Sequence, residues 1–199
     1  MGNSVIVHLI RHEKTEANTM RKYLGWTDES ILDIHESFHI PFQSKLVYGS
    51  DLKRCVETAK LYFPIAEYKA FSPLRELNFG DFEMKTYDQL KNLLIYREWI
   101  DCPQQITPPN GENFKHFKHR VLACFKQIVN QPHEYTFVVH GGVIRLLLSE
   151  FGPSKQTFNE IAVNHRTIYT LKWSNPNLIK GGLRCESLLV EPIMEKRPM

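Results

Sequence analysis

Arg11 and His12 put a fixed positive charge beside an imidazole at the start of the segment 11–18, which reads RHEKTEAN. An imidazole can attack phosphorus or move a proton, and a guanidinium neutralises the oxygens of a phosphate group. Thr15 and Asn18 add a hydroxyl and an amide a few residues later. Together these side chains predict a small anion-binding pocket. An isolated Arg-His pair is more often a surface turn, because short motifs match by chance.

A second histidine, His140, lies in the segment 135–142, which reads YTFVVHGG. His12 and His140 both follow apolar runs rich in β-branched residues, which indicate strands buried on both faces. If these strands are parallel, both histidines lie at the same edge of a sheet, where open α/β sheets bind ligands. We expect Gly141 and Gly142 to let the backbone turn tightly into a helix. Taken alone, His140 fits a buried structural histidine, but the repeated pattern favours a site.

Arg54 and Glu76 add a further cation and an acid. A serine and an aspartate predict the start of a helix over 52–62, with Arg54 in its first turn. A cation there is unfavourable for the helix but suits an anion bound at the N-terminus, although a solvated charge is the alternative. Glu76 lies between apolar neighbours, where desolvation favours the protonated form that can donate to a leaving oxygen. Alone, Arg75-Glu76 fits a surface ion pair equally well.

The remaining elements follow from hydrophobic periodicity and turn residues. The pattern predicts helices over 87–99, 114–129 and 143–151 and strands over 46–48, 168–173 and 188–190. A segment over 101–113 that is rich in proline predicts an exposed loop that borders the substrate. Arg145 is consistent with a pocket, packing or surface role, and Glu83 with a structural or rim contact.

Four segments resemble the motifs of the histidine phosphatase superfamily, which includes the cofactor-dependent phosphoglycerate mutases and many small phosphatases. They are RHEKTEAN at 11–18, SDLKRCVETA at 50–59, LRELNFGDFE at 74–83 and VVHGGVIRLLL at 138–148. The segment PPNGEN at 108–113 is similar to one found in small phosphatases of the family, including α-ribazole phosphatases. The resemblance implies an α/β three-layer sandwich with a mostly parallel central sheet flanked by helices, in a single domain over 1–199.

The resemblance also implies a role for individual side chains. His12 would take the phosphoryl group as a phosphohistidine, and Glu76 would protonate the leaving oxygen and later deprotonate water. Arg11, Arg54 and His140 would surround the phosphate oxygens. No metal or cofactor would be required. Further contacts to the substrate are expected from Thr15, Asn18 and Gly141.

Two residues depart from the family's pattern. Glu13 follows the nucleophile where the family usually has glycine or another small residue. It puts a negative side chain near an anion site unless it points outward or is compensated by Lys14. Met84 stands where a glycine is common. The segment 30–43 is also shorter than its counterpart in the family.

Composition predicts one ordinary α/β domain, since 42% of the 199 residues are hydrophobic and 24% are charged. A net charge of +3 without a Lys/Arg cluster argues against nucleic acid as a partner. No leader and no apolar run of about 18 residues is present, so a cytoplasmic protein without a membrane partner is expected. The four cysteines lack metal or disulfide spacing and indicate reduced thiols. His35 and His39 match metal-ligand spacing on a helix but have no third ligand nearby, so surface histidines are expected.

Three functions remain open. A mutase must exclude water beneath a lid while its phosphohistidine persists, and this chain lacks room after Glu76 for the larger insertion of typical mutases. The sequence therefore predicts a metal-independent phosphomonoesterase, monomeric or homodimeric, that acts on a small phosphorylated metabolite. Phosphoglycerate mutase-type transfer is the alternative. A non-catalytic phosphate-binding or regulatory module is the alternative from another class, although the complete catalytic set argues against it.

Overall fold

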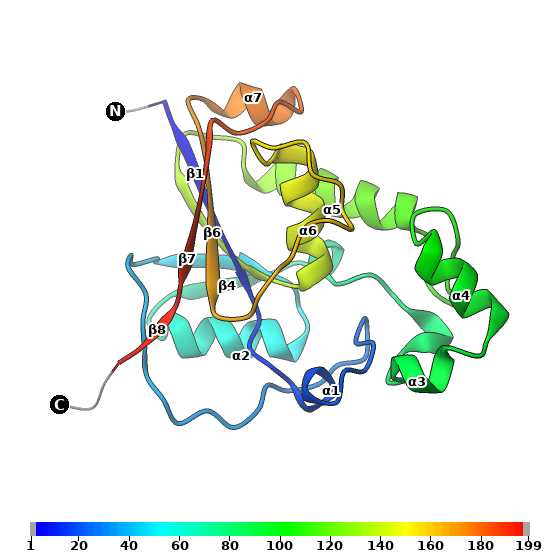
Figure 1. Ribbon diagram of the computed structural model, residues 1–199. Helices are drawn as coiled ribbons and strands as arrows, with labels where there is room; N and C mark the ends of the chain where they lie inside the picture. The colour runs from blue at the N-terminus through cyan, green and yellow to red at the C-terminus, as the bar shows by residue number, and fades with distance from the viewer. Residues whose placement is uncertain (1–2, 197–199) are drawn as a thin grey trace.

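A six-stranded sheet forms the middle of the computed structural model, which describes residues 3–196 (Figure 1). Its strand order is β4-β3-β5-β1-β6-β7. The first four strands in this order are parallel, β6 is antiparallel to β1, and β7 is antiparallel to β6. The predicted mostly parallel sheet is therefore confirmed. The strands are β1 (Val5–Arg11), β3 (Leu46–Gly49), β4 (Glu67–Ala70), β5 (Glu134–Val139), β6 (Thr167–Trp173) and β7 (Ser187–Pro192).

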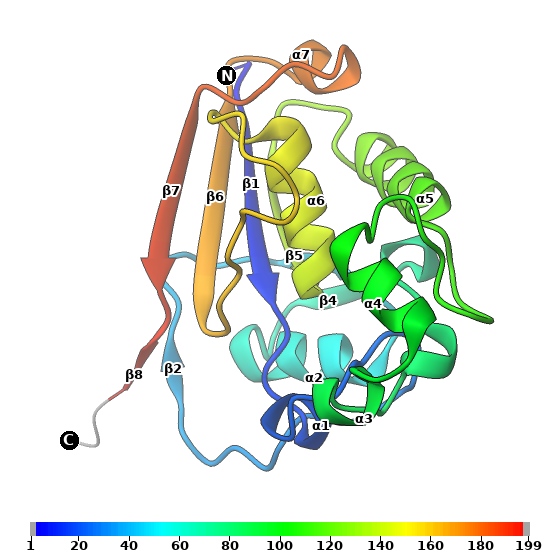
Figure 2. The same ribbon diagram turned by 45° about the vertical axis from the view of Figure 1, so that its right-hand side comes forward.

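Helices cover both faces of this sheet. Leu9 of β1 packs in the core cluster shared with α5 (Phe114–Ile128) and α6 (Gly141–Phe151), two helices that lie together beside the sheet in Figure 2. Its neighbour Ile10 packs in the opposite cluster, with residues of α2 (Lys53–Tyr62). Successive side chains of a strand point to opposite faces, so the sheet is buried on both sides and the fold has three layers. The short elements are α1 (Glu16–Thr19), α3 (Tyr87–Leu90), α4 (Leu94–Asp101), α7 (Pro176–Lys180), η1 (Ser72–Leu74) and η2 (Gly80–Phe82).

The pairing of β1 with β5 determines where the two histidines lie. The strands are parallel neighbours, and their register pairs Arg11 with Val139. His12 and His140 each follow the last residue of their strand, and the N–H of His12 donates to the carbonyl of Val139 at 2.9 Å. Both histidines therefore lie at the same carboxyl edge of the sheet, as the apolar runs predict.

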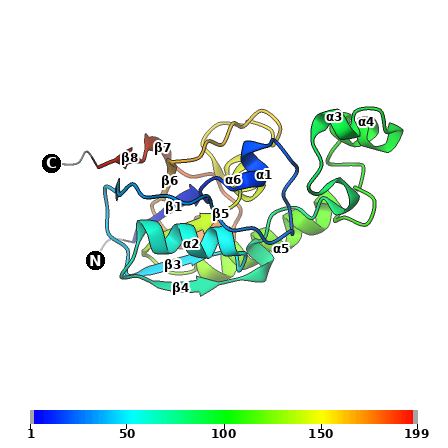
Figure 3. The same cartoon turned by 90° about the horizontal axis from the view of Figure 1, so that it is seen from below.

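The prediction of one continuous helix over 87–99 is wrong. The chain forms α3 and α4 with a break between them, and Figure 3 shows both lying together away from the sheet. Leu94 is an apolar residue within the predicted helix, yet it is 73% exposed. The break allows Leu90 on one side and Tyr96 and Trp99 on the other to pack around Phe82. Tertiary packing thus overrides the helical periodicity of the segment.

The segment with His35 and His39 forms no helix. His39 belongs to β2 (Phe38–His39), which pairs with β8 (Met194–Glu195) in a small second sheet. His35 is exposed and lies 3.4 Å from the carboxylate of Asp33. Within residues 3–196, no helix is long and apolar enough to cross a membrane. Cys55, Cys124 and Cys185 are buried, Cys102 is exposed, and all four are free thiols.

Candidate active site

His12 is buried with one ring nitrogen occupied. Its Nδ1 lies 2.6 Å from the carbonyl oxygen of Glu13, and only 4% of the residue is exposed. A carbonyl can only accept, so Nδ1 carries the proton and Nε2 keeps a lone pair. Burial, followed by the charges of Arg54 and Arg11, holds the pKa of His12 well below its usual value. His12 is therefore a neutral imidazole whose Nε2 makes no hydrogen bond within residues 3–196.

His140 faces His12 with the opposite proton arrangement. The two ring centroids are 5.2 Å apart at an interplanar angle of 65°. Nε of Arg54 donates to Nδ1 of His140 at 3.3 Å, which leaves the proton of the neutral ring on Nε2. Burial, then the charge of Arg54 and the neighbouring His12, holds the pKa of His140 well below its usual value. One histidine thus offers a lone pair and the other a donor.

Arg54 is fixed by the loop that precedes the segment 30–43. The side chain is completely buried in the first turn of α2, and its guanidinium donates to the carbonyls of Gly25 at 2.6 Å and Thr27 at 2.9 Å. The carboxylate of Glu83 holds this loop by accepting the N–H groups of Trp26 and Thr27, each at 2.7 Å. Glu83 therefore makes a structural contact, one of the two roles that the sequence left open.

Arg11 keeps a donor without a partner. Its Nη1 donates to the carbonyl of Val163 at 3.0 Å, while its Nε is buried and makes no hydrogen bond within residues 3–196. A Cβ built on Gly141 would lie 3.4 Å from that Nε, so Gly141 and Arg11 are in close contact. An unpaired buried donor costs about 1–3 kcal/mol, and an anionic ligand would remove this cost.

The carboxylate of Glu76 lies against the first turn of α6 and accepts hydrogen bonds from backbone N–H groups. Oε2 accepts the N–H of Gly142 at 2.7 Å and Oε1 accepts that of Leu77 at 3.0 Å. A Cβ built on Gly142 would lie 2.2 Å from Oε1 of Glu76. The chain turns directly from β5, which ends at Val139, into α6, which begins at Gly141, as expected, although neither Gly141 nor Gly142 has a positive φ. Gly142 also makes room for the acid.

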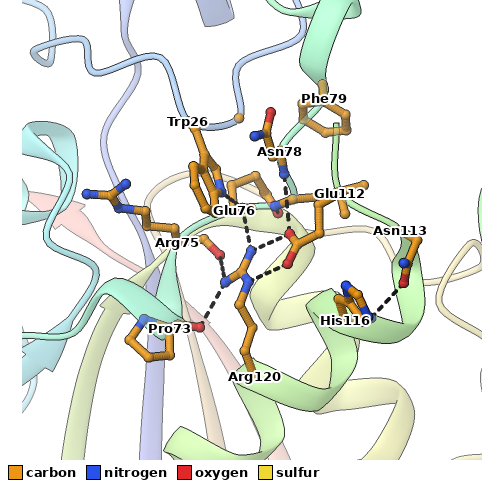
Figure 4. A network of polar contacts seen from close by, with 12 residues as sticks. Trp26, Pro73, Arg75, Glu76, Asn78, Phe79, Glu112, Asn113, His116 and Arg120 are labelled. Atoms are coloured by element: carbon orange, nitrogen blue, oxygen red, sulfur yellow. Dashed lines mark hydrogen bonds and ion pairs between the residues drawn. The ribbon is translucent and has the colours of Figure 1, made fainter. Parts of the chain in front are cut away.

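Arg120 holds the backbone on which Glu76 stands (Figure 4). Its Nη1 donates to the carbonyls of Pro73 at 2.8 Å and Arg75 at 2.7 Å, and its Nη2 donates to the carbonyl of Glu76 at 2.8 Å. Glu112 accepts from Nε and Nη2, both at 2.7 Å. All five N–H donors of Arg120 are therefore used. Nothing in the sequence singles out Arg120. Its partner Glu112, however, lies within the segment PPNGEN, which resembles one in small phosphatases.

Arg75 points away from Glu76. It pairs with Asp51 through two contacts of 2.6 and 2.7 Å, and its guanidinium lies 5.2 Å from the ring centre of Trp26. Nε1 of Trp26 in turn donates to the carbonyl of Glu76 at 2.9 Å. The alternative of a surface ion pair between Arg75 and Glu76 is therefore wrong.

Thr15 and Asn18 form the capping box of α1. The Thr15 hydroxyl accepts the N–H of Asn18 at 3.3 Å, and Oδ1 of Asn18 accepts the N–H of Thr15 at 3.2 Å. These bonds use the acceptor oxygens of both side chains. Among the described residues, the amide NH₂ of Asn18 and the hydroxyl hydrogen of Thr15 are not used in these bonds.

Glu13 turns away from the histidines into a cluster of its own. Its carboxylate is buried, accepts the hydroxyl of Tyr62 and lies 3.1 Å from Nε of Arg166. Arg166 also pairs with Glu195. The negative charge is thus compensated by Arg166, which is 153 residues distant in sequence, and not by Lys14.

Two residues near the histidines escaped the sequence analysis. Nδ1 of His165 donates to the carbonyl of His12 at 2.8 Å, and the two rings are 5.7 Å apart. Burial and the charge of Arg11 lower the pKa of His165 to about 4. Sγ of Cys55 lies 3.6 Å from Nε2 of His140, and burial raises the pKa of this thiol to about 12. No local pattern marks His165, which only the folded chain brings to the site, whereas Cys55 directly follows Arg54 in the segment 50–59.

These contacts join the predicted residues at one edge of the sheet. The imidazoles face each other, Arg54 contacts one of them, and Glu76 and Arg11 contact the first two residues of α6. The predicted residues brought together in this way are Arg11, His12, Arg54, Glu76, His140 and Gly141.

A model of the histidine phosphatase superfamily (branch 1) matches residues 7–179, and the chain belongs to this superfamily. Phosphoglycerate mutase-like protein 4 of Arabidopsis thaliana is 25% identical over 186 residues, which cover 83% of this chain and 81% of that protein. A 2,3-bisphosphoglycerate-dependent phosphoglycerate mutase of Cytophaga hutchinsonii is 23% identical over 163 residues, which cover 72% of this chain and 75% of that protein.

Solved structures give the same result. The alpha-ribazole phosphatase from Shigella flexneri superposes with a TM-score of 0.68 at 25% identity, covering 83% of this chain and 89% of that one. The phosphoglycerate mutase from Bacillus anthracis superposes with a TM-score of 0.64 at 22% identity, over 91% and 97% of the chains. The fold is that of the phosphoglycerate mutase-like proteins, and the protein is an enzyme of the histidine phosphatase superfamily.

Proposed function

We propose that this protein is a metal-independent phosphomonoesterase that hydrolyses a small phosphate ester through a phosphohistidine on His12. One observation carries the proposal: the proton of His12 is held on Nδ1 by the Glu13 carbonyl, so that Nε2 keeps its lone pair, in a ring whose centroid lies 5.2 Å from that of His140. A neutral imidazole with a fixed tautomer is the form that can attack phosphorus.

The reaction proceeds in two displacements. The Nε2 lone pair of His12 bonds to phosphorus while the bond from phosphorus to the ester oxygen breaks, and the leaving oxygen takes a proton from the carboxyl group of Glu76. The Glu76 carboxylate then takes a proton from water. The oxygen of this water attacks phosphorus and breaks the bond to His12. Inorganic phosphate leaves, and both side chains return to their starting protonation states.

Positive charge around the phosphate comes from the protein. Arg11 and Arg54 supply guanidinium groups, and His140 supplies the N–H on its Nε2. Donors fixed before the substrate binds stabilise the transition state in a buried site without reorganising. The amide of Asn18 is a further donor. We therefore propose that these groups neutralise the phosphate oxygens and that no metal is needed.

The hydrolase proposal is tested with p-nitrophenyl phosphate in EDTA. We expect phosphate release, and a loss of at least about 100-fold in kcat for His12→Asn. Glu76→Gln keeps the shape of the acid but cannot exchange the proton, so phosphate should accumulate on the protein in an acid-labile form. Activity that requires an added metal, or wild-type rates in both variants, would contradict the mechanism.

The mutase alternative is supported by the names of the sequence relatives, which include phosphoglycerate mutases. It is tested with 3-phosphoglycerate, and isomerisation faster than hydrolysis would decide for it. The non-catalytic alternative rests on Glu13 and on the shortened segment 30–43. The carboxylate of Glu13 is neutralised by Arg166 and turned toward Tyr62, which favours turnover over simple phosphate binding.

A further inference from the structure

Trp26 lies where the segment that carries the acid meets the loop that holds Arg54. We propose that Trp26 is a positioning residue, which keeps the carboxyl group of Glu76 in a fixed place relative to the guanidinium of Arg54. This inference rests on the proposed function, and it names a further residue on which the proton transfer of that reaction depends.

The loop 25–28 holds Arg54 through its carbonyl groups. The two terminal nitrogens of the guanidinium donate to the carbonyls of Gly25 and Thr27. Oδ1 of Asp28 accepts the N–H of the first residue of α2 at 2.8 Å. The loop therefore fixes both the side chain of Arg54 and the start of the helix to which Arg54 belongs.

The same loop contacts the segment of the acid. Nε1 of Trp26 donates to the carbonyl of Glu76 at 2.9 Å, and Figure 4 shows the two residues side by side. A Cβ built on Gly25 would lie 2.3 Å from the carbonyl oxygen of Leu77, so the two backbones approach as closely as a glycine allows. The loop thus contacts Arg54 on one side and the backbone of Glu76 on the other.

Hydrophobic packing does not account for a tryptophan at this position. Trp26 is 39% exposed and belongs to none of the hydrophobic core clusters among the described residues. Two guanidiniums lie near its ring instead, at 5.2 Å for Arg75 and 5.8 Å for Arg120. Each is held by a carboxylate, that of Asp51 or that of Glu112. Tryptophan offers the best ring for such cations and adds an N–H donor, so its contacts suit it to hold the Glu76 backbone.

General acid catalysis depends on the relative placement of Arg54 and Glu76. In the proposed reaction, Arg54 binds the phosphate oxygens, and the leaving oxygen is one bond from phosphorus, so the acid must be in register with Arg54. A misplacement of about 1 Å can cost about 100-fold in rate. The carbonyl of Glu76 accepts from Trp26 and from Arg120. Loss of the indole donor should therefore impair proton transfer more than phosphate binding.

The test compares two esters that differ in their need for an acid. Propyl phosphate releases an alkoxide that must be protonated, whereas p-nitrophenyl phosphate releases a phenolate that needs no proton. The ratio of their kcat/KM values reports on formation of the phosphohistidine, because hydrolysis of this intermediate is common to both esters.

Two variants separate the donor from the ring. Trp26→Phe keeps an aromatic ring and removes the N–H, and it should lower the propyl-to-nitrophenyl ratio of kcat/KM at least about 3-fold. Trp26→Leu also removes the ring and should lower this ratio at least about 10-fold. The inhibition constant of inorganic phosphate, which reports on Arg54, should change less than about 2-fold in Trp26→Phe. If Trp26→Leu does not fold, Trp26→Phe decides alone.

Trp173→Phe is the matched control, because it makes the same chemical change away from the site. The indole N–H of Trp173 donates to the carbonyl of Leu183 at 3.2 Å. Trp173 pairs with Val5 at the start of β1, the end of the strand opposite to His12. Trp173→Phe should leave the ester ratio and the inhibition by phosphate unchanged.

The outcomes separate this inference from the proposed function. An unchanged ester ratio in Trp26→Phe, with both esters hydrolysed by the wild type, overturns the positioning role and leaves the phosphatase intact. Equal losses on both esters with weaker inhibition by phosphate also overturn it, because Trp26 would then act only on Arg54. A wild-type protein that hydrolyses neither ester overturns the proposed function itself.

Discussion

The backbone N–H of Gly142 donates to Oε2 of Glu76 at 2.7 Å, and Gly142 lies two residues after His140. The acid and one of the two histidines are thus joined through a single turn of α6. This turn requires glycine because a Cβ at 142 would occupy the space of the Glu76 carboxylate.

Gly142→Ala should therefore displace Glu76 and lower kcat at least about 10-fold, since small misplacements at a reacting centre are costly. Gly181→Ala, at the end of α7 and outside the site, is the control, because the nearest atom to its Cβ is the carbonyl oxygen of Asn177 at 3.4 Å. The loss should be larger for propyl phosphate than for p-nitrophenyl phosphate, whose leaving group needs no proton. A Gly142→Ala variant with wild-type kcat on both esters would refute this role.

Arg120 should act as a positioning residue for the same acid. Lysine cannot reproduce the two bonds to Glu112 together with the three bonds to carbonyls, so Arg120→Lys should loosen the backbone at Glu76. We expect kcat on propyl phosphate to fall about 10-fold or more, with a smaller loss on p-nitrophenyl phosphate. Lys118→Met on the same helix is the control. Equal losses on both esters would indicate general destabilisation instead of acid positioning.

Below about pH 6.5, the free energy of unfolding should decrease as the pH is lowered. His12, His140 and His165 have pKa values lowered in the folded protein by burial, so the unfolded chain binds more protons in that range. The stabilisation that comes from keeping these histidines neutral is complete above about pH 6.5, the pKa of histidine in the unfolded chain. At lower pH it decreases by up to about 1.4 kcal/mol per pH unit for each histidine. Urea titrations at pH 7.5, 6.5 and 5.5 measure the slope.

His165→Asn is the matched variant for this measurement. Its amide can still donate to the His12 carbonyl but does not titrate, so the slope between pH 6.5 and about 4 should be shallower than in the wild type. A slope that is unchanged in His165→Asn would contradict the assignment to this residue.

Met84 should be replaceable by glycine with a gain in stability. Its φ is 61°, in the left-handed region that disfavours side chains with a Cβ. After allowing for the greater freedom of glycine when unfolded, Met84→Gly should raise the free energy of unfolding by up to about 1 kcal/mol. Lys85→Gly, at a neighbouring residue without a positive φ, should lower it. Thermal unfolding of both variants decides the matter.

Several features of the candidate site can be predicted from short segments of the sequence. The apolar runs before His12 and His140 predict two buried strands, and parallel strands must end at the same edge. The departure at Met84 also has a local explanation, because a position where the family has glycine adopts a positive φ here. Such features depend on a few neighbouring residues, so a single sequence is sufficient to predict them.

Other features depend on contacts between distant segments. Arg166 neutralises Glu13 across 153 residues, and Arg120 reaches the loop of Glu76 from another helix. No periodicity or spacing marks such pairs. The exposed Leu94 shows the same limit from the other side, because an apolar pattern cannot say which positions the rest of the fold will cover.

The cluster around Glu13 connects the far end of the described chain to His12. Glu13 directly follows His12 in the sequence. Arg166 forms ion pairs with Glu13 and with Glu195 of β8. Separation of β8 from β2 would therefore remove one of the two carboxylates that hold the Arg166 guanidinium, and the other belongs to the residue whose carbonyl fixes the tautomer of His12.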